Sequence, residues 1–296
     1  MLDTPTTLAV LGAALIHAGW NASLKSRGEP LFESALMHLW LVPIALATLV
    51  GLPAPDPFTL ICVLASAVVH GVYFQVLAAA YRHADFSITY PILRGCAPAM
   101  TAAGAMIWMH ESPTASGWLG ISLICGGVIT IGLLATRKRA SALSGDHDPQ
   151  VQDTAVIRRA IGWALCTALT IVAYTLIDSA GVRSAPQAWM YMVWLTIAQA
   201  AVLGGVVSLR SRREFIAYAR SRGAWPIVAG LGLILSYGIA LWAMTRAPVA
   251  AVAALRETSI VFALLIARLF LGERPGTGRW IAAAVIALGV IVLRMP

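Results

Sequence analysis

The chain has 296 residues, of which 59% are hydrophobic and only 11% are charged, against roughly 25% charged in a typical soluble domain. The mean hydropathy of +0.80 predicts an integral membrane protein surrounded by the lipid bilayer. The net charge of +8 comes from cations in short loops between apolar runs, so no nucleic-acid partner is expected. The four cysteines stand singly in apolar runs, and we expect neither a metal nor a cofactor.

Ten runs of about 17 to 24 mostly apolar residues predict ten transmembrane helices, because only helices satisfy their own backbone in lipid at this sequence pattern. The runs lie at residues 5–24, 33–51, 58–81, 86–109, 117–136, 160–178, 188–209, 225–244, 249–271 and 278–294. The polar segment 137–159 is predicted to be a flexible linker. The predicted fold class is therefore an all-α membrane protein with two five-helix units, residues 1–136 and 160–296.

The two predicted units resemble each other in sequence at an offset of 162 residues. Polar, aromatic and turn residues coincide at this offset: Arg94 with Arg256, Glu111 with Glu273, Pro113 with Pro275, Trp118 with Trp280 and Gly127 with Gly289. A unit of five spans has an odd number of crossings, so its second copy must enter the membrane from the opposite side. The sequence thus predicts two inverted-topology repeats around a central cavity, an arrangement that many transporters use.

The loop cations predict the orientation of the chain. Lys and Arg residues number sixteen in the loops on one side, against three on the other side, at Arg183, Arg246 and Arg294. The positive-inside rule places the richer side in the cytoplasm. We therefore expect a multi-pass protein of an inner (plasma) membrane, with both termini on the non-cytoplasmic side.

Arg94 is the charge that the fourth predicted span has to accommodate. It follows Asp85 by nine residues, which places it roughly 13 Å along a helix, where a charge costs on the order of 2.5 to 3.5 kcal/mol. Arg256 occupies the matching place in the ninth span. A guanidinium in a partly dry cavity is a fork-shaped donor for a carboxylate or phosphate, so both arginines are candidate substrate contacts. The alternative is that each binds backbone carbonyls freed by a helix irregularity, such as the one Pro98 would cause.

Glu257 follows Arg256 directly, and the two side chains point about 100° apart on a helix. A carboxyl group at this depth is a candidate proton carrier, which would allow proton-coupled transport. The alternative is a salt bridge to Arg94 or Arg256 across the bundle.

Further candidate substrate contacts are polar and aromatic residues inside predicted spans. His17 and Asn21 lie four residues apart on one helix face, with Trp20 beside them. The remaining candidates are His70, Tyr73, Phe74, Tyr90, Tyr237 and Trp242. Aromatic walls would hold a planar or apolar part of a metabolite, although such residues are often core or interface residues instead. Asp178 and Asp85, at predicted span ends, are expected to be solvated boundary residues.

Several of these motifs together resemble a known family. The segments YPILRGCAP and LRETSIVFA, with the helix-end glutamates of MHESP and LGERP, are similar to those of EamA-type ten-helix transporters of the drug/metabolite transporter (DMT) superfamily. The resemblance covers nearly the whole chain. It implies that spans 1, 3, 4, 6, 8 and 9 surround a central cavity and that spans 5 and 10 pack behind it.

The function expected from these observations is secondary transport, by alternating access, of a small organic anion or zwitterion such as an amino-acid-like metabolite. Export is the preferred direction, although an inverted repeat is compatible with either. The chain is expected to be a monomer or homodimer and not an enzyme. There are two alternatives. The first is a membrane-embedded enzyme for lipid-type substrates, but such enzymes usually need a cluster of carboxylates or histidines, and the sequence has none. The second is a non-transporting membrane partner or sensor.

Overall fold

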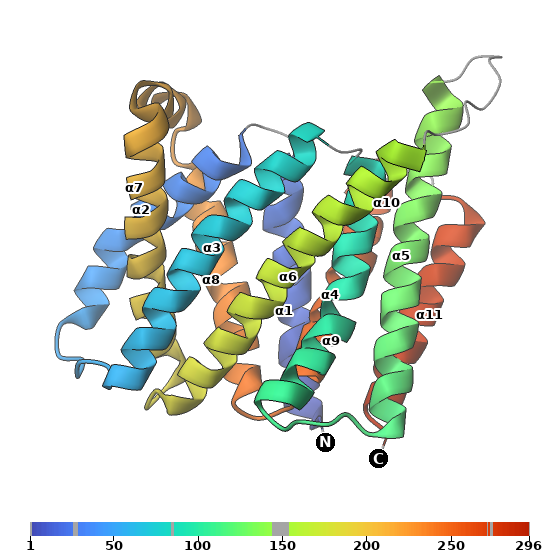
Figure 1. The fold of residues 1–296 in the computed structure, drawn as a ribbon, viewed down its shortest axis with the longest axis horizontal. Helices are drawn as coiled ribbons and strands as arrows, with labels where there is room; N and C mark the ends of the chain where they lie inside the picture. Colours follow the sequence, from blue (N-terminus) through green and yellow to red (C-terminus); the bar gives the residue numbers. More distant parts are fainter. Residues whose placement is uncertain are drawn as a thin grey trace.

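The computed structural model describes residues 2–25, 29–83, 86–143, 154–270, 272 and 275–295 of the chain. In these ranges the chain forms helices joined by turns, with no strand (Figure 1). The helices are α1 (Thr4–Lys25), α2 (Pro30–Leu49), α3 (Pro57–His83), α4 (Phe86–Trp108), α5 (Ala115–Leu143), α6 (Thr154–Ser184), α7 (Ala188–Arg222), α8 (Trp225–Met244), α9 (Val249–Arg256), α10 (Ser259–Phe270) and α11 (Thr277–Leu293).

Five helices, which correspond to four of the predicted spans, differ from the prediction. The predicted ninth span is interrupted, and α9 and α10 lie on either side of Glu257 and Thr258. Helix α7 continues past its predicted end at 209 to Arg222, with a kink where Ser211 leaves the helical region at φ −149° and ψ 38°. The described ends of the predicted linker 137–159 are helical, because α5 runs to Leu143 and α6 begins at Thr154. The rest of that linker lies outside the described residues.

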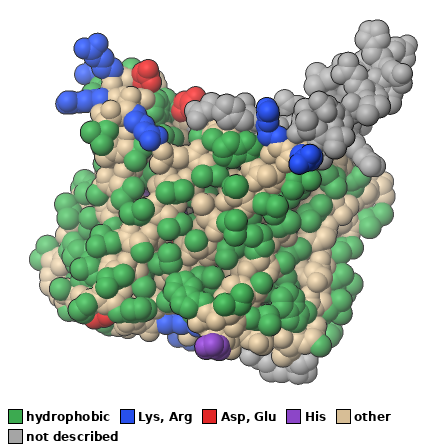
Figure 2. Space-filling view, viewed as in Figure 1, with side chains coloured by type: hydrophobic (Ala, Val, Ile, Leu, Met, Phe, Trp, Pro, Cys, Tyr) green, Lys and Arg blue, Asp and Glu red, His purple; other side chains and the backbone are tan. Residues whose placement is uncertain are grey.

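Seven apolar segments of the described chain are long enough to cross a membrane when α9 and α10 are counted together, and α11 is a shorter apolar helix. Figure 2 shows a broad band of hydrophobic side chains on the surface of the molecule, and most of the Lys and Arg side chains in view gather beyond one edge of this band. Both termini lie at the opposite end (Figure 1). The chain is therefore a multi-pass membrane protein, while the count of ten spans and the side of the termini stay predictions.

The last helix of each predicted unit packs away from the centre of the bundle. Helix α5 lies against α11 along its length. Gly127 permits this approach, because a Cβ atom there would lie 2.5 Å from Cγ1 of Ile286 and 3.0 Å from the carbonyl oxygen of Ala282. The neighbouring Gly126 faces outward with nothing within 4 Å of such an atom. Close helix approach through small residues replaces the hydrophobic driving force that is lacking between helices in lipid.

The remaining helices make contacts that cross between the two predicted units. Helices α3 and α4 pack on α6, α1 packs on α8 and α10, α2 packs on α7, and α4 packs on α9. These contacts come in pairs that the predicted repeat relates to each other. The contact of α3 with α6 corresponds to that of α8 with α1, and the contact of α4 with α6 corresponds to that of α10 with α1. The first and second halves therefore share one interface, and the central cavity lies along it.

Candidate substrate cavity

A cavity of about 610 Å³ lies between the two halves. Its walls come from α1, α2, α3, α4, α6, α7, α8 and α9, including the last residue of α9 and the break that follows it. Among the described residues α5 and α11 contribute nothing to the lining, as the resemblance implied. Helices α2 and α7 also line the cavity, which the resemblance did not imply.

The candidate residues predicted from the sequence converge on this cavity with one exception. Its lining includes His17, Trp20, Asn21, His70, Tyr73, Phe74, Tyr90, Arg94, Tyr237, Arg256 and Glu257. The exception is Trp242, which lies on a different cavity and stacks with the guanidinium of Arg246 at 4.7 Å. Trp242 lies five residues after Tyr237 on α8, and this spacing turns it to another face of the helix.

Arg94 forms an ion pair across the interface between α4 and the broken ninth span. Its Nε lies 2.9 Å from Oε2 of Glu257, and the two side chains are only 16% and 9% exposed. Its Nη2 donates a hydrogen bond of 2.8 Å to Oγ of Ser259. The Nε contact lacks hydrogen-bond alignment, so it is chiefly a contact between charges. The charge of Arg94 is therefore balanced within the protein, and the salt-bridge alternative for Glu257 describes this structure.

Arg256 is held differently from Arg94. Its guanidinium carbon lies 5.0 Å from the centre of the Tyr237 ring, a cation–π geometry. Among the described residues it has no ion-pair or hydrogen-bond partner, and neither arginine is bound to main-chain carbonyls. Because Arg94 and Glu257 neutralise each other, Arg256 leaves the charged side chains of the lining with one unbalanced positive charge.

The break in the ninth span places Arg256 and Glu257 at the cavity. Helix α9 ends at Arg256, and the next turn tightens, with Glu257 N–H donating to Ala254 O and Thr258 N–H donating to Leu255 O. The Thr258 hydroxyl also donates to Leu255 O at 2.7 Å. Such an interruption is tolerated at membrane depth only where it is buried in protein or lines a cavity. Discontinuous helices of this kind form the midplane sites of many transporters.

Aromatic rings form one wall of the cavity. His70 stacks on Tyr174 at 4.0 Å, and Tyr174 lies 5.8 Å from Tyr73 and 6.3 Å from Tyr237 between ring centres. The His70 ring is fixed by the Ser66 carbonyl, 2.9 Å from Nδ1. Across the cavity, Trp20 donates from Nε1 to Ser236 Oγ at 3.2 Å. The cavity thus combines planar apolar surfaces with fixed polar atoms, the composition of a small-molecule site.

Among the lining residues that sequence reasoning missed, three have aromatic or polar side chains with defined contacts: Tyr174, His38 and Gln199. Tyr174 is the central ring of the aromatic wall, and His38 joins α2 to α7 through a contact of 3.0 Å between its Nε2 and Oε1 of Gln199. His38 and Gln199 are both buried. They are 161 residues apart, so nothing in their local sequence indicates that they meet. The available signal was the presence of a polar residue inside each of two predicted membrane spans.

Asp178 corrects the expectation of a solvated boundary residue. It is completely buried, because α6 continues beyond the predicted span to Ser184. Its two carboxyl oxygens accept hydrogen bonds from the hydroxyl groups of Tyr191, at 2.7 Å, and Tyr237. Tyr237 therefore has a double role, since its ring lies under Arg256 and its hydroxyl holds Asp178 behind the cavity wall. Asp85, which was expected to be a boundary residue too, lies outside the described residues.

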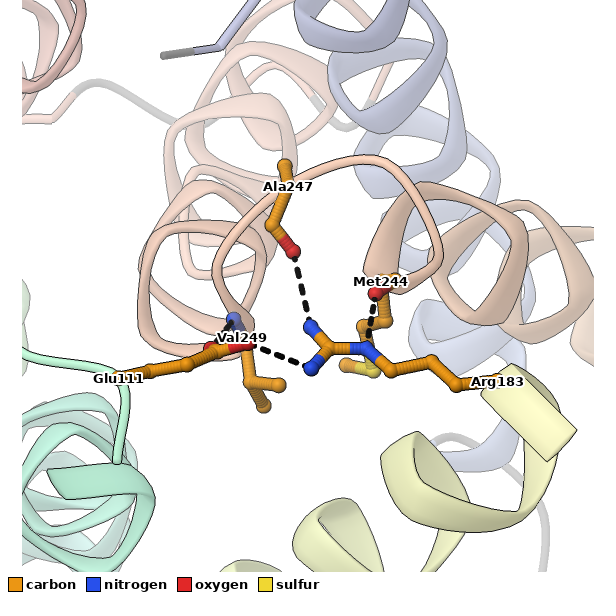
Figure 3. A network of polar contacts seen from close by, with 5 residues as sticks. All are labelled: Glu111, Arg183, Met244, Ala247 and Val249. Atoms are coloured by element: carbon orange, nitrogen blue, oxygen red, sulfur yellow. Dashed lines mark hydrogen bonds and ion pairs between the residues drawn. The ribbon is translucent and has the colours of Figure 1, made fainter. Parts of the chain in front are cut away.

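The helix-end glutamate of the first unit holds the bundle together at the end where the termini lie. Figure 3 shows Glu111 and Arg183 meeting between the ends of α8 and α9. Arg183 contacts Oε1 of Glu111 at 2.5 Å and donates from Nε to Met244 O at 2.8 Å, while Oε2 of Glu111 accepts from the backbone N–H of Val249 at 3.0 Å. These contacts join α6, α8, α9 and the turn after α4. Its repeat partner Glu273 lies outside the described residues.

Comparison with known proteins bears on the second half of the chain. Residues 158–295 match the model of the EamA-like transporter family. Residues 158–295 are thus similar to the EamA-like transporter domain of the DMT superfamily. The matched segment contains Arg256, Glu257 and Tyr237, whereas Arg94 comes from the half that precedes it. The family is one of membrane transporters, and the cavity lies where its helices meet those of the first half.

Solved structures share the fold of the whole chain. There are 28 matching chains of solved structures. One of them, described only as "Crystal structure of protein", superposes on this protein with a TM-score of 0.71, and the superposition covers 99% of each chain. The identity to that chain is 15%, so the likeness concerns the fold alone. No curated protein matches the chain.

Proposed function

We propose that the protein is a secondary transporter that moves a small organic anion or zwitterion, such as an amino-acid-like metabolite, through the central cavity. The observation that carries this proposal is the state of the two arginines. Arg94 forms an ion pair with Glu257, whereas the guanidinium of Arg256 lines the cavity and forms no ion pair with the described residues. A permanently charged guanidinium in a confined, partly dry space attracts a carboxylate or phosphate.

The shape of the cavity supports a ligand of metabolite size. Its volume of about 610 Å³ lies within the range of roughly 300 to 1,000 Å³ that is usual for small-molecule sites. The stacked rings of His70, Tyr174 and Tyr73 offer a flat surface to the ligand body. The acid group of the ligand would lie at Arg256, and its planar or apolar part would lie against this wall.

The arrangement of the halves supports alternating access. The Glu111 and Arg183 contacts join helix ends at the side of the termini, whereas cavity residues Asn21 and Phe74 lie toward the cation-rich ends of α1 and α3. In the orientation predicted from the loop charges, this conformation is closed to the outside. Opening would break the Glu111 contacts and rock the two halves about the cavity, and export from the cytoplasm would begin in the conformation described.

Glu257 has a place in this mechanism as the partner of Arg94. An anion arriving at the cavity would compete with Glu257 for Arg94, which would bring both arginines to the ligand. Release of Glu257 would then free a carboxyl group for a proton, which gives coupling a physical route. Proton coupling is thus a part of the proposal that depends on the ion pair being separable.

Ligand binding tests the proposal without knowledge of the substrate. Purified protein would be screened by thermal shift against sets of organic acids, zwitterionic amino acids and cationic amines, because a ligand of the folded state raises the melting temperature. We expect acids or zwitterions to stabilise the wild type, and Arg256→Gln to weaken their affinity by about 10- to 100-fold, the value of a charge-assisted hydrogen bond. Stabilisation by cationic amines alone, or unchanged affinity in Arg256→Gln, would overturn the proposal.

The alternative classes predict different results with the same ligands. A membrane-embedded enzyme would convert the stabilising compound, which mass spectrometry of the incubated mixture would detect. A sensor would bind it but give no exchange of radiolabelled ligand across a vesicle membrane. A transporter returns the compound unchanged and exchanges it.

A further inference from the structure

A second cavity, of about 950 Å³, lies between α2, α7 and α8. It shares no lining residue with the central cavity. The turn between α6 and α7, residues 185–187, closes one end of it. We call it the α2–α7–α8 groove.

The walls of this groove are apolar side chains that the described protein leaves uncovered. Ile44 is 50% exposed, Trp189 47%, Leu231 48% and Leu235 54%, and they come from all three helices. Exposed apolar side chains are ordinary in a membrane span, because lipid surrounds them. What distinguishes this surface is that it is concave. Within a membrane, the groove therefore has the surface character of a site for a hydrocarbon chain.

The polar groups of the groove gather at one end. Arg183, Gln187, Thr245 and Arg246 lie there, at the ends of α6 and α8 and before the start of α7. Arg183 is already occupied by Glu111 and by the carbonyls of Met244 and Ala247. Of the two cations at this end of the groove, Arg183 therefore has partners within the protein, and Arg246 is the second.

Arg246 is exposed, it stacks over Trp242 at 4.7 Å, and it forms no ion pair with the described residues. Asp3 is near enough for an electrostatic effect but makes its own hydrogen bond to the backbone of Thr6 instead. An arginine beside a tryptophan at a helix end is typical of the headgroup level of a bilayer.

The length of the groove matches one leaflet. Arg246 follows Leu231 by 15 residues, which along a helix corresponds to about 22 Å. Half of a bilayer is about 20 to 22 Å thick when its headgroup region is included. The groove therefore extends from the headgroup level at Arg246 to about the middle of the bilayer at Leu231.

From this combination we infer that the α2–α7–α8 groove binds an anionic glycerophospholipid. Its phosphate lies at Arg246, and one acyl chain lies along Leu235 and Ile44 toward Leu231. A charged headgroup would supply the ion pair that Arg246 lacks, and an acyl chain would fit the length and apolar character of the walls. In the orientation predicted from the loop charges, the lipid belongs to the leaflet away from the cytoplasm.

Native mass spectrometry of the full-length protein tests this inference. The detergent-purified protein would be incubated with equal amounts of palmitoyl-oleoyl phosphatidylglycerol and phosphatidylcholine, which share their chains and differ in net charge. The wild type should retain phosphatidylglycerol over phosphatidylcholine by about fivefold, the effect of one basic residue near a membrane surface. Arg246→Gln should bring this ratio close to one.

Two further variants locate the lipid. Arg294→Gln is the matched control, because Arg294 is a cation at the same end of the molecule that bonds to Thr4 and lies away from the groove; it should keep the wild-type ratio. Leu235→Trp should fill the groove and lower the retention of both lipids, and Ile44→Trp repeats this test from the opposite wall. Gel filtration and melting temperature would establish that each variant is folded.

The inference is overturned by any of three outcomes. The first is an unchanged lipid ratio in Arg246→Gln. The second is an equal loss in Arg294→Gln, which would indicate a general surface-charge effect. The third is full lipid retention in both tryptophan variants, or a lipid-free dimer that disappears in them, which would make a second copy of the chain the occupant.

Discussion

The ion pair between Arg94 and Glu257 gives a quantitative prediction. We expect Glu257→Gln to destabilise the protein, because it leaves the guanidinium of Arg94 at membrane depth with Ser259 as its remaining hydrogen-bond acceptor. Arg94→Gln should also destabilise, since it leaves the carboxylate of Glu257 unpaired. The double variant removes both charges and should be more stable than the sum of the single effects implies.

The magnitude follows from the geometry of the pair. The atoms in contact are 2.9 Å apart, so the centres of charge are about 4 Å apart, a separation at which two charges interact by about 4 kcal/mol at an effective dielectric constant of about 20. Removing one partner of a buried pair commonly costs about 3 to 5 kcal/mol. Arg94 keeps its bond to Ser259 and faces the cavity, which reduces the cost, so we expect about 2 to 4 kcal/mol for each single variant and a coupling energy of about 2 to 3 kcal/mol.

A double-mutant cycle measures this coupling. Equilibrium unfolding of the four proteins in mixed micelles, followed by tryptophan fluorescence, would give the free energies of unfolding. Arg268→Gln, on the exposed end of α10, is a matched control that should change stability little. A coupling energy below about 0.5 kcal/mol, the level expected of independent sites, would refute the argument that the pair balances the charge of Arg94.

Three further changes have distinct expected outcomes. Gly127→Ala should lower the free energy of unfolding by about 1 to 3 kcal/mol through overpacking, whereas Gly126→Ala should be neutral or raise it by up to about 1 kcal/mol; equal effects in unfolding experiments would contradict the packing of α5. Arg183→Gln should cost about 1 to 3 kcal/mol, because Glu111 and two carbonyls lose their donor, and an unchanged melting temperature would show that these contacts are weak. The Thr59 hydroxyl and nearby backbone N–H groups lower the pKa of Asp56 below its ordinary value of 3.8. The carboxylate therefore stabilises the start of α3 at pH values above 3.8, and this stabilisation is lost as the pH falls through the lower folded pKa. Asp56→Asn should remove this acid-dependent loss of melting temperature, and identical pH profiles of the melting temperature in the two proteins would contradict the argument.

Much of the architecture could be predicted because it depends on patterns along the chain. Apolar runs of membrane length predicted the helices closely, and the match of Arg94 with Arg256 predicted two charges at the same cavity. The EamA resemblance was confirmed for residues 158–295. Helices α5, α6 and α7 are longer than their apolar runs. A hydropathy pattern ends where the polar residues begin, whereas a helix can continue into a polar segment.

The pairing of polar groups could not be predicted, because it depends on contacts between distant helices. The sequence left Glu257 open between proton carrier and ion-pair partner, and only the packing of α4 on α9 places it beside Arg94. Asp178 was wrongly expected to be solvated because a carboxylate near a predicted span end is usually exposed. Its burial depends on the hydroxyl groups of Tyr191 and Tyr237, 13 and 59 residues away. Trp242 was assigned to the cavity from its neighbour Tyr237, although five residues along a helix change the face.

Exchange transport tests the role of Arg256 most directly. Proteoliposomes loaded with an unlabelled compound that stabilises the purified protein would be placed in a trace of the same compound with a radioactive label, and counterflow would be followed with the wild type, Arg256→Gln and Arg294→Gln. The account predicts counterflow with the wild type and Arg294→Gln and its loss with Arg256→Gln, at equal amounts of folded protein. Counterflow at the wild-type rate in Arg256→Gln would contradict it.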